Sequence, residues 1–212
     1  MTPTSGAVAR PVTVRARIVR AARERLFSHG YGRLTMDELA AELGVSKKTL
    51  YRHFASKEAL ARQVITDLGR EVRTHADGIL DNPRLSFAQK LQDFITGMVQ
   101  RLTQMSPRLL QDLQRFAPDL HDLILSMRRR NIPDIFGRLL AEGQRRGMVR
   151  RDLDPGFAAE FLLHAMQGLM QPVALDHLRL GPQEVFEKAM NIFFGGLLTP
   201  AGRKDYEKFL SR

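Results

Sequence analysis

Helix start signals recur along this chain and constrain its fold more than any other feature. Two pairs of residues have the capping-box spacing, in which two side chains satisfy each other's backbone N–H groups. Prolines elsewhere follow a capping residue, at the first helical position, where a missing N–H is tolerated. The capping-box pairs are Thr35 with Glu38 and Ser86 with Gln89; the proline sites are Ser106-Pro107 and Asp154-Pro155, with Gly181-Pro182 and Thr199-Pro200 as weaker versions.

Apolar residues recur at helical spacing between these signals. Val14, Ile18 and Leu26 lie on one stripe of a first helix, which Gly30 and Gly32 end. Further helices are expected at 57–80, 86–104, 107–116, 119–147, 155–171, 182–198 and 201–210, with a kink at Pro133. No strand-like alternation and no Asn-Gly hairpin occur, so the sequence predicts an all-α fold.

Positive charge is concentrated in the first third of the chain. The 33 Lys and Arg against 23 Asp and Glu give a net charge of +10. Residues 1–62 carry 12 basic and 5 acidic side chains, whereas residues 63–212 carry 21 and 18. This distribution is expected if the N-terminal region meets a polyanion, although a basic surface that only confers solubility is the alternative. Residues 1–12 are small, polar and proline-containing, typical of a disordered basic arm.

Several functional classes find no support in the sequence. The absence of cysteine excludes disulfides, cysteine-based zinc sites and a thiol nucleophile. The six histidines show no i, i+4 metal spacing, and no hydrolase, metalloprotease or nucleotide-binding motif occurs, so no catalysis, metal or cofactor is expected. No signal peptide and no apolar run of 18 residues is found, which favours a cytoplasmic protein without a membrane partner.

The segment from Met36 to Phe54 has the spacing of a helix-turn-helix motif. Ala40 is small enough for two helices to cross closely, and Gly44 suits a tight turn with positive φ. Ser46 caps the second helix, whose first turn presents side chains as a recognition helix does. The apolar residues expected to hold the two helices together are Leu39, Leu43, Val45, Leu50 and Phe54.

With these residues the sequence resembles the TetR family of bacterial transcriptional regulators, over about Arg17–Val64. The match runs through Ile18-x2-Ala21-Ala22-x3-Leu26-Phe27-x2-His29-Gly30-Tyr31, then Leu34-Thr35-Met36-x2-Leu39-Ala40-x3-Gly44-Val45-Ser46-x2-Thr49-Leu50-Tyr51-x-His53-Phe54-x-Ser56-Lys57-Glu58-x-Leu60. The departure is Lys47-Lys48, where many members carry a smaller or less charged pair. The resemblance implies an N-terminal DNA-binding domain (13–62) and a larger helical ligand-binding and dimerisation domain (63–212).

The resemblance also assigns roles at the DNA. It implies phosphate contacts from Thr35, Tyr51, His53 and Lys57. Base edges would be read by Lys47, Lys48 and Thr49, since a lysine favours guanine O6 and N7 and a threonine methyl can meet a thymine methyl. Arg52 either contacts DNA or solvates its helix.

Two further sites are expected in the C-terminal region. Segments that line the effector cavity in relatives carry Phe94, Met98, Leu102, Met105, Phe116, Leu123, Met127 and His164, although a plain apolar core is the alternative and His164 fits a core histidine. Two helices have apolar arcs too wide for one-sided burial, which favours a homodimer over two central helices of a monomer. The expected interface is Phe161, Ala165, Leu169, Phe186, Ala189, Met190, Phe193 and Phe194. Arg128-Arg129-Arg130 predicts a solvated face.

The expected function is that of a homodimeric regulator, most simply a repressor, which a small-molecule ligand releases from a palindromic operator. A non-specific architectural DNA-binding protein shares the basic region but needs no cavity. A helical dimeric adaptor is a further alternative and predicts no DNA affinity. An architectural protein should bind all duplexes within a few-fold, whereas a regulator should prefer its operator by roughly 10³ or more.

Overall fold

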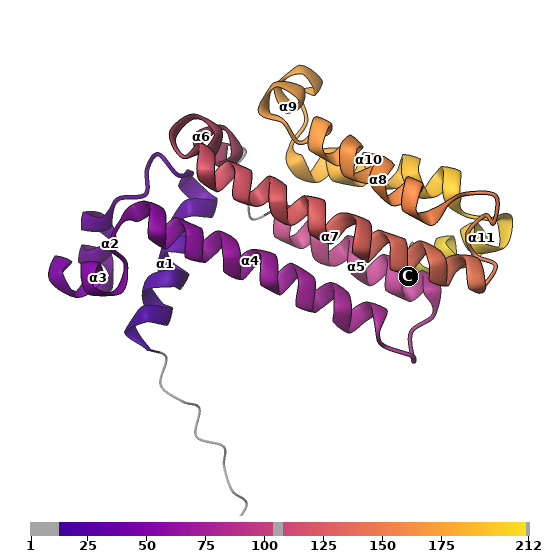
Figure 1. The fold of residues 1–212 in the computed structure, drawn as a ribbon, viewed down its shortest axis with the longest axis horizontal. Coiled ribbons are helices and arrows are strands. Elements are labelled where there is room, and N and C mark those ends of the chain that lie inside the picture. Colours follow the sequence, from indigo (N-terminus) through magenta and orange to yellow (C-terminus); the bar gives the residue numbers. More distant parts are fainter. Residues whose placement is uncertain (1–12, 104–107, 211–212) are drawn as a thin grey trace, which may run out of the picture.

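The computed structural model describes residues 13–103 and 108–210, which form eleven α-helices and no β-strand (Figure 1). The expected arm at 1–12, Met105 and the Ser106-Pro107 cap lie outside these residues. The helices are α1 (Val14–His29), α2 (Met36–Leu43), α3 (Lys47–His53), α4 (Lys57–Leu80), α5 (Phe87–Thr103), α6 (Arg108–Phe116), α7 (Pro118–Arg145), α8 (Pro155–Leu169), α9 (Pro172–Leu178), α10 (Pro182–Leu197) and α11 (Pro200–Leu210).

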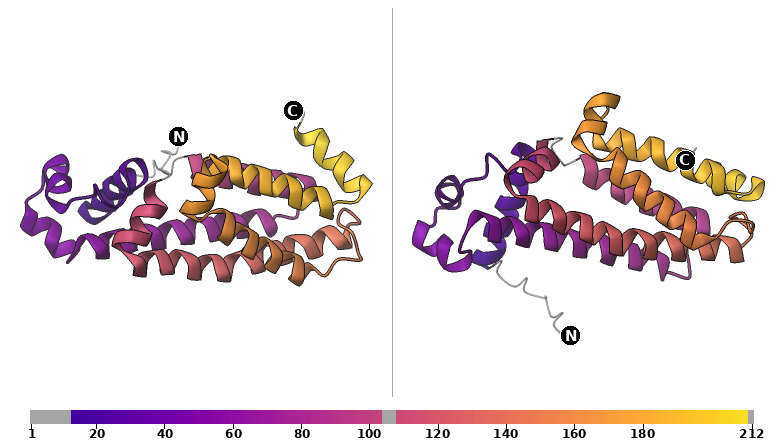
Figure 2. Two further views of the ribbon diagram at one scale, coloured as in Figure 1. Left: turned by 90° about the horizontal axis from the view of Figure 1, so that it is seen from above. Right: turned by 45° about the horizontal axis from the view of Figure 1, so that its top comes forward.

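The long helices α4, α5 and α7 run along the molecule, with α2 and α3 at one end and α11 at the other (Figure 1). Helix α1 packs on α4, and α4 packs on α7. A further layer is formed by α8, which packs on α7, and by α10, which packs on α5 and on α8 (Figure 2). None of the helices in the described ranges is long and apolar enough to cross a membrane.

Side-chain caps begin several helices at the expected residues. Ser86 and Gln89 form the predicted capping box, with the two N–H···O distances at 3.2 and 2.9 Å. Thr35 accepts a hydrogen bond from the Glu38 N–H at 3.3 Å, but the Glu38 carboxylate pairs with Arg25 instead of closing the box. Asp154 Oδ1 accepts from the Phe157 N–H at 2.6 Å, so this cap is confirmed.

Two details differ from the expectation. The helix expected at 155–171 ends at Leu169, and a separate short helix, α9, starts at Pro172. Pro172 takes the first helical position, where its missing N–H is tolerated, and Arg179 ends α9 at a φ of 54°. Helix α7, expected at 119–147, runs from Pro118 to Arg145 and is helical on both sides of Pro133, and the expected kink there stays a prediction.

Buried apolar residues form two cores. The larger core is built from α4, α5, α7, α8 and α10 and includes Phe94, Phe136 and Phe194. The smaller core joins α1–α3 to the start of α4, and it also takes in Leu109, Leu113 and Leu120 from α6 and α7. Residue 62 falls inside α4, so the two expected domains share a continuous helix.

Candidate DNA-binding face and effector cavity

The turn between α2 and α3 is built from small residues. Gly44 ends α2 with a φ of 65°, a left-handed conformation that glycine adopts without a Cβ clash. The Val45 N–H reaches back to the Ala40 carbonyl at 3.0 Å, and Ala40 is buried at the crossing of the helices. Ser46 Oγ accepts from the Thr49 N–H at 3.0 Å and so caps α3. The helix-turn-helix geometry expected from the sequence is therefore present.

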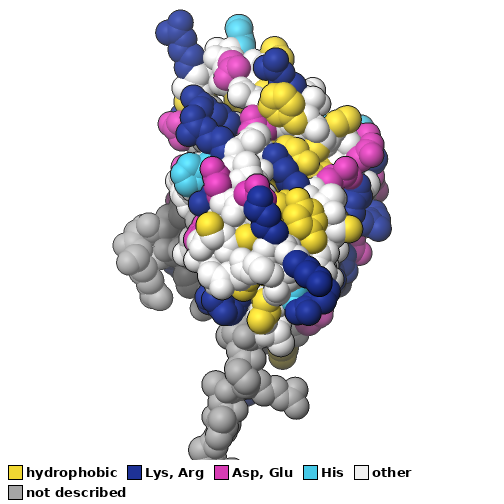
Figure 3. Space-filling model, turned by 90° about the vertical axis from the view of Figure 1, so that its left-hand side faces the viewer, with side chains coloured by type: hydrophobic (Ala, Val, Ile, Leu, Met, Phe, Trp, Pro, Cys, Tyr) yellow, Lys and Arg dark blue, Asp and Glu magenta, His cyan; other side chains and the backbone are white. Residues whose placement is uncertain are grey.

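Leu50 anchors α3, since it is fully buried in the smaller core. The opposite side of α3 is exposed and carries Lys47, Lys48 and Arg52. Tyr51 is 48 % exposed, and Thr35 at the start of α2 is exposed as well. This end of the molecule shows Lys and Arg side chains interspersed with Asp and Glu (Figure 3).

The three residues expected to read bases lie in the first turn of α3 and differ in their hydrogen-bond and ion-pair partners. The Lys47 ammonium donates to Asp37 Oδ2 of α2 at 2.7 Å, and this pairing raises the pKa of Lys47. Thr49 Oγ1 lies 2.9 Å from Ser46 Oγ. Among the described residues, Lys48 has no ion pair and is exposed, so it is the lysine directly available to a base or phosphate.

Two other expected phosphate contacts are less exposed. His53 is half-buried at the end of α3. Lys57 begins α4 with its ammonium over the Tyr31 ring, 4.2 Å from the ring centre, and 3.5 Å from the Gly32 carbonyl oxygen. Burial lowers the pKa of Lys57, while the charge of Asp112 opposes that shift. A phosphate contact from Lys57 would require its side chain to leave Tyr31.

A hydrogen bond connects α6 to the loop before α2. Asp112 Oδ2 of α6 accepts from the Gly32 N–H at 2.7 Å. Gly30 has a φ of 84°, and a Cβ there would lie 2.5 Å from Asp112 Oδ2. Glycine at position 30 therefore allows both the turn and the close approach of α6.

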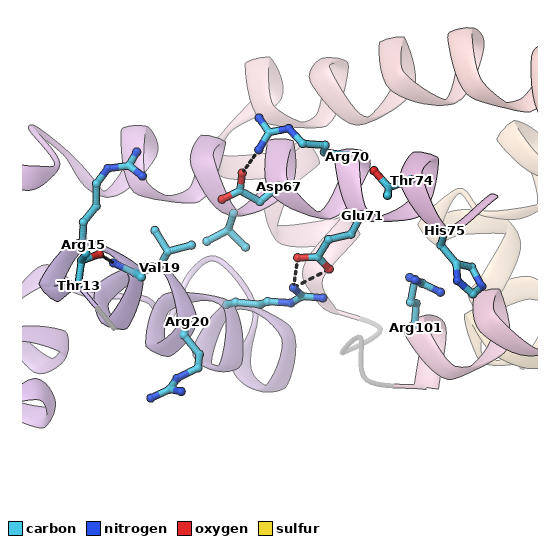
Figure 4. A pocket seen from close by; sticks show the side chains of 13 residues that line it. Thr13, Arg15, Val19, Arg20, Asp67, Arg70, Glu71, Thr74, His75 and Arg101 are labelled. Carbon is cyan, nitrogen blue, oxygen red and sulfur yellow. Dashed lines mark hydrogen bonds and ion pairs between the residues drawn. The ribbon is translucent and has the colours of Figure 1, made fainter. Parts of the chain in front are cut away.

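A groove of about 830 Å³ lies between α1 and α4, next to Arg101 of α5 (Figure 4). Charged pairs occupy its walls: Arg23 Nη1 donates to both carboxylate oxygens of Glu71 at 2.7 and 2.8 Å, and Arg70 pairs with Asp67 at 3.0 Å. Because these charges already have partners and the groove opens to solvent, it is a poor candidate for holding a small molecule.

A smaller, largely apolar cavity of about 190 Å³ lies between the two cores. Phe94, Met166 and Phe186 contribute to its walls from the larger core. Phe27 of α1, Ile65 of α4 and Leu109 of α6 contribute from the smaller core, which holds the helix-turn-helix. The cavity therefore touches the packing that supports the DNA-binding helices.

Comparison with known proteins agrees with this architecture. Residues 18–64 match the model of the bacterial regulatory proteins of the tetR family. The repressor DhaR of Mycobacterium sp. strain GP1 is 24% identical over 188 residues, covering 87% of this chain and 92% of its own. A TetR-family regulator from Agrobacterium tumefaciens superposes with a TM-score of 0.66 at 16% identity, over 87% of this chain and 97% of its own. The chain is thus similar to the TetR family in its DNA-binding region and along most of its length.

The overall fold is shared with a solved structure of a protein in complex with a small molecule. The SmeT–triclosan complex, whose protein is the repressor of a Stenotrophomonas maltophilia efflux pump, superposes with a TM-score of 0.62 at 16% identity, over 88% of this chain and 92% of its own. In line with these similarities, the present protein is a DNA-binding transcriptional regulator.

The structure brings half of the expected effector residues to the cavity. These are Phe94, Met98, Leu102 and Met127. Three others lie elsewhere: Phe116 is 56 % exposed at the end of α6, and Leu123 packs against the smaller core. His164 is exposed beside Glu160, because the inner face of α8 is formed by Leu162 and Met166.

One cavity residue was assigned wrongly from the sequence. Arg128 lines the cavity, whereas Arg129 and Arg130 are exposed, so the expected solvated face holds for two of the three arginines. A helix turns by about 100° per residue, which separates adjacent side chains onto different faces. The spacing of Arg128 from Ile124, Asn131 and Ile135 is the signal that identifies its face.

Half of the expected dimer residues are already buried in the chain's own core, which leaves little of their surface for a partner. Phe186, Met190, Phe193 and Phe194 are buried against α5 and α7. Phe161 is 60 % exposed on α8, and Ala165, Leu169 and Ala189 are half-buried. Phe157 and Ile192, outside the expected set, are 73 % and 79 % exposed.

Proposed function

We propose that this protein is a homodimeric repressor that a small molecule releases from a palindromic operator. The observation that carries the proposal is the position of the cavity between the two cores, with walls from α1, α4 and α6. A ligand that binds there contacts the packing beneath the helix-turn-helix directly. The DhaR relative is a repressor, and SmeT binds triclosan in a cognate fold, which supports the same class of function here.

We also propose that the two functions divide along the chain as the resemblance implied, although α6 and the start of α7 pack on the DNA-binding helices. We assign DNA binding to residues 13–62 and effector binding and dimerisation to residues 63–212. Phe157 and Phe161 on α8 and Ile192 on α10 are exposed apolar side chains that a second copy would cover. A two-fold dimer places two recognition helices about one DNA turn apart, which accounts for a palindromic operator.

A ligand releases DNA only if it binds the released conformation more tightly. Moving the population from mostly bound to mostly released needs a difference of about 10⁴-fold in affinity for the two conformations. Two features could make the ligand affinity differ between the two conformations. They are the Asp112–Gly32 hydrogen bond and the cavity wall residues that the two cores share.

Fluorescence anisotropy with the DNA upstream of the protein's own gene, against a scrambled duplex, tests the proposal. We expect a preference of roughly 10³ or more for the operator and an affinity that falls steeply as salt rises. Equal binding to upstream and scrambled duplexes, and to duplexes selected from random DNA, would favour an architectural protein. An absence of DNA binding at low salt would favour a dimeric adaptor.

Lys48→Ala is expected to weaken operator binding by about 1–3 kcal/mol, with relaxed specificity at one base pair, if the lysine reads a base. Lys47→Ala should have a smaller effect, because Lys47 must first exchange its Asp37 partner for DNA. Anisotropy against single-base operator variants measures both, with Arg129→Ala as a control for charge loss away from α3. A loss that is uniform across all duplexes would assign the lysine to a phosphate, and unchanged affinity in both variants would contradict the placement of α3 at the bases.

Asp112→Ala is expected to bind operator but to respond less to an inducer. Removing the acceptor for the Gly32 N–H should reduce the coupling free energy between ligand and DNA by about 0.5–2 kcal/mol. Inducer titrations of the operator complex measure this, and Asp112→Asn, which keeps an acceptor oxygen, is the matched control. Superimposable release curves for Asp112→Ala and the unmodified protein would show that α6 does not transmit the signal through this bond.

A further inference from the structure

The cavity wall carries positive charge without negative charge to balance it. Its walls contain two arginines, Arg101 and Arg128, one amide, Asn131, and otherwise apolar side chains and Gly69. No Asp or Glu contributes to the part of the wall that the structure describes. Arg101 Nη1 donates to the Gly97 carbonyl at 2.6 Å, and Arg101 also faces the groove beside α1. Arg128 is therefore the arginine whose guanidinium is free to meet a ligand.

Other arginines near the cores have carboxylate partners. Arg73 pairs with Asp77 and Asp134, and Arg138 with Asp77 and Asp81. Within residues 13–103 and 108–210, Arg128 makes no hydrogen bond and no ion pair. Arg128 is half-buried, and a guanidinium that loses part of its water without gaining a partner is destabilised, so the missing partner at this position calls for an explanation.

We propose that the cavity binds small organic acids, with the Arg128 guanidinium holding the carboxylate and the apolar walls holding the rest of the molecule. This assignment rests on the proposed role of the cavity as the effector site. A guanidinium offers two parallel N–H donors to a carboxylate, which makes it a specific partner for that group. Asn131 lies one helical turn along α7 and can donate a further hydrogen bond.

The electrostatics of Arg128 agree with an anionic ligand. Burial lowers the pKa of Arg128, with no carboxylate acting in the opposite direction. In contrast, carboxylate partners raise the pKa of Arg73 and of Arg138. A bound carboxylate would supply the missing negative charge. One free guanidinium balances one charge, so a monocarboxylate fits better than a phosphate monoester, which carries about −1.5 to −2.

The walls define the rest of the ligand. Five methionines line the cavity, and their flexible thioethers adapt to bodies of several shapes. These are Met98, Met127, Met166, Met170 and Met190. Phe94 and Phe136 add aromatic surface. A volume of about 190 Å³ is below the roughly 300–1,000 Å³ of sites for drug-sized ligands, which favours a small acid.

Calorimetric titration of the full-length protein without DNA tests the assignment. The probes are octanoate and 4-phenylbutanoate, each compared with its primary amide, which keeps the body and removes the charge. Acids should bind at least about 10-fold more tightly than their amides, because a hydrogen-bonded ion pair inside an apolar cavity is worth roughly 1.5–3 kcal/mol. Arg128→Met should abolish this acid preference, and Arg129→Met, an exposed neighbour, should retain it.

The ratio of acid affinity to amide affinity separates a specific role of Arg128 from a general effect on folding. Both ligands are titrated into the same protein sample, so a folding defect lowers both affinities and leaves their ratio unchanged. Amides that bind as tightly as acids, an acid preference that persists in Arg128→Met, or no acid binding at millimolar concentration would each overturn the assignment. Failure of operator binding in the anisotropy experiment would reject the proposed function while leaving acid binding intact, so the two failures are distinguishable.

Discussion

Phe161→Glu is expected to convert the proposed dimer into a monomer and to lower operator affinity by about 10²–10⁴-fold. Phe161 is 60 % exposed on α8, one helical turn from Phe157, which is 73 % exposed. Association would remove water from a carboxylate at this position without giving it a hydrogen-bond or ion-pair partner, and this cost disfavours the dimer. Two linked recognition helices bind far more tightly than one, and the expected loss in operator affinity is the loss of this avidity.

Light scattering coupled to size exclusion gives the mass, and anisotropy gives the operator affinity. Phe116→Glu is the matched control for the mass, because Phe116 is similarly exposed but lies on α6. A Phe161→Glu protein that remains dimeric would move the interface away from α8.

Phe136→Ala is expected to lower the free energy of unfolding by about 3–5 kcal/mol, the usual range for removing a buried phenylalanine ring. Phe136 is the centre of an aromatic cluster, with ring-centre distances of 5.2 Å to Phe94, 6.1 Å to Phe193 and 6.3 Å to Phe194. The first two pairs have edge-to-face geometry, which adds to the loss from burial alone.

Urea and thermal unfolding at one fixed protein concentration measure the effect, since a dimer's stability depends on concentration. The melting temperature should fall by roughly 6–20 °C for a chain of this size. Phe116→Ala, which removes an exposed ring, should change it by a small fraction of that amount. Equal losses in the two variants would contradict the central position of Phe136 in the core.

Local features of the fold were predictable because nearby residues determine them. Ser46 and Asp154 cap the helices that follow them, and Gly44 provides the positive φ of the turn between α2 and α3. Each of these depends on contacts within about four residues, which the sequence displays directly. The division of the region after Leu169 into α9 and a linker was missed, because the apolar pattern before Pro172 continued without a stop signal.

Long-range placement was harder to predict. The wide apolar arc of α10 suggested burial on two sides, but Phe186, Met190 and Phe194 all face helices of the same chain. An apolar arc shows how much of a helix is covered and does not show whether the cover is the same chain or another. The cavity position of Arg128 was missed because it belongs to a run of three arginines that was interpreted as one solvated face. The Asp112–Gly32 hydrogen bond joins residues 80 positions apart, and sequence spacing carries no information at that separation.

The composition of the smaller core determines which segment of this protein can be exchanged with a related regulator in a chimera. Leu109 and Leu113 of α6 and Leu120 of α7 pack among the residues of α1–α4, so the DNA-reading head is discontinuous in sequence. A chimera that joins residues 1–62 of one relative to the remainder of another would place foreign side chains against these leucines. Recombination between related regulators should therefore succeed when the α6 segment is transferred with the DNA-binding helices, and new operator specificity would then be transferred together with part of the proposed effector cavity.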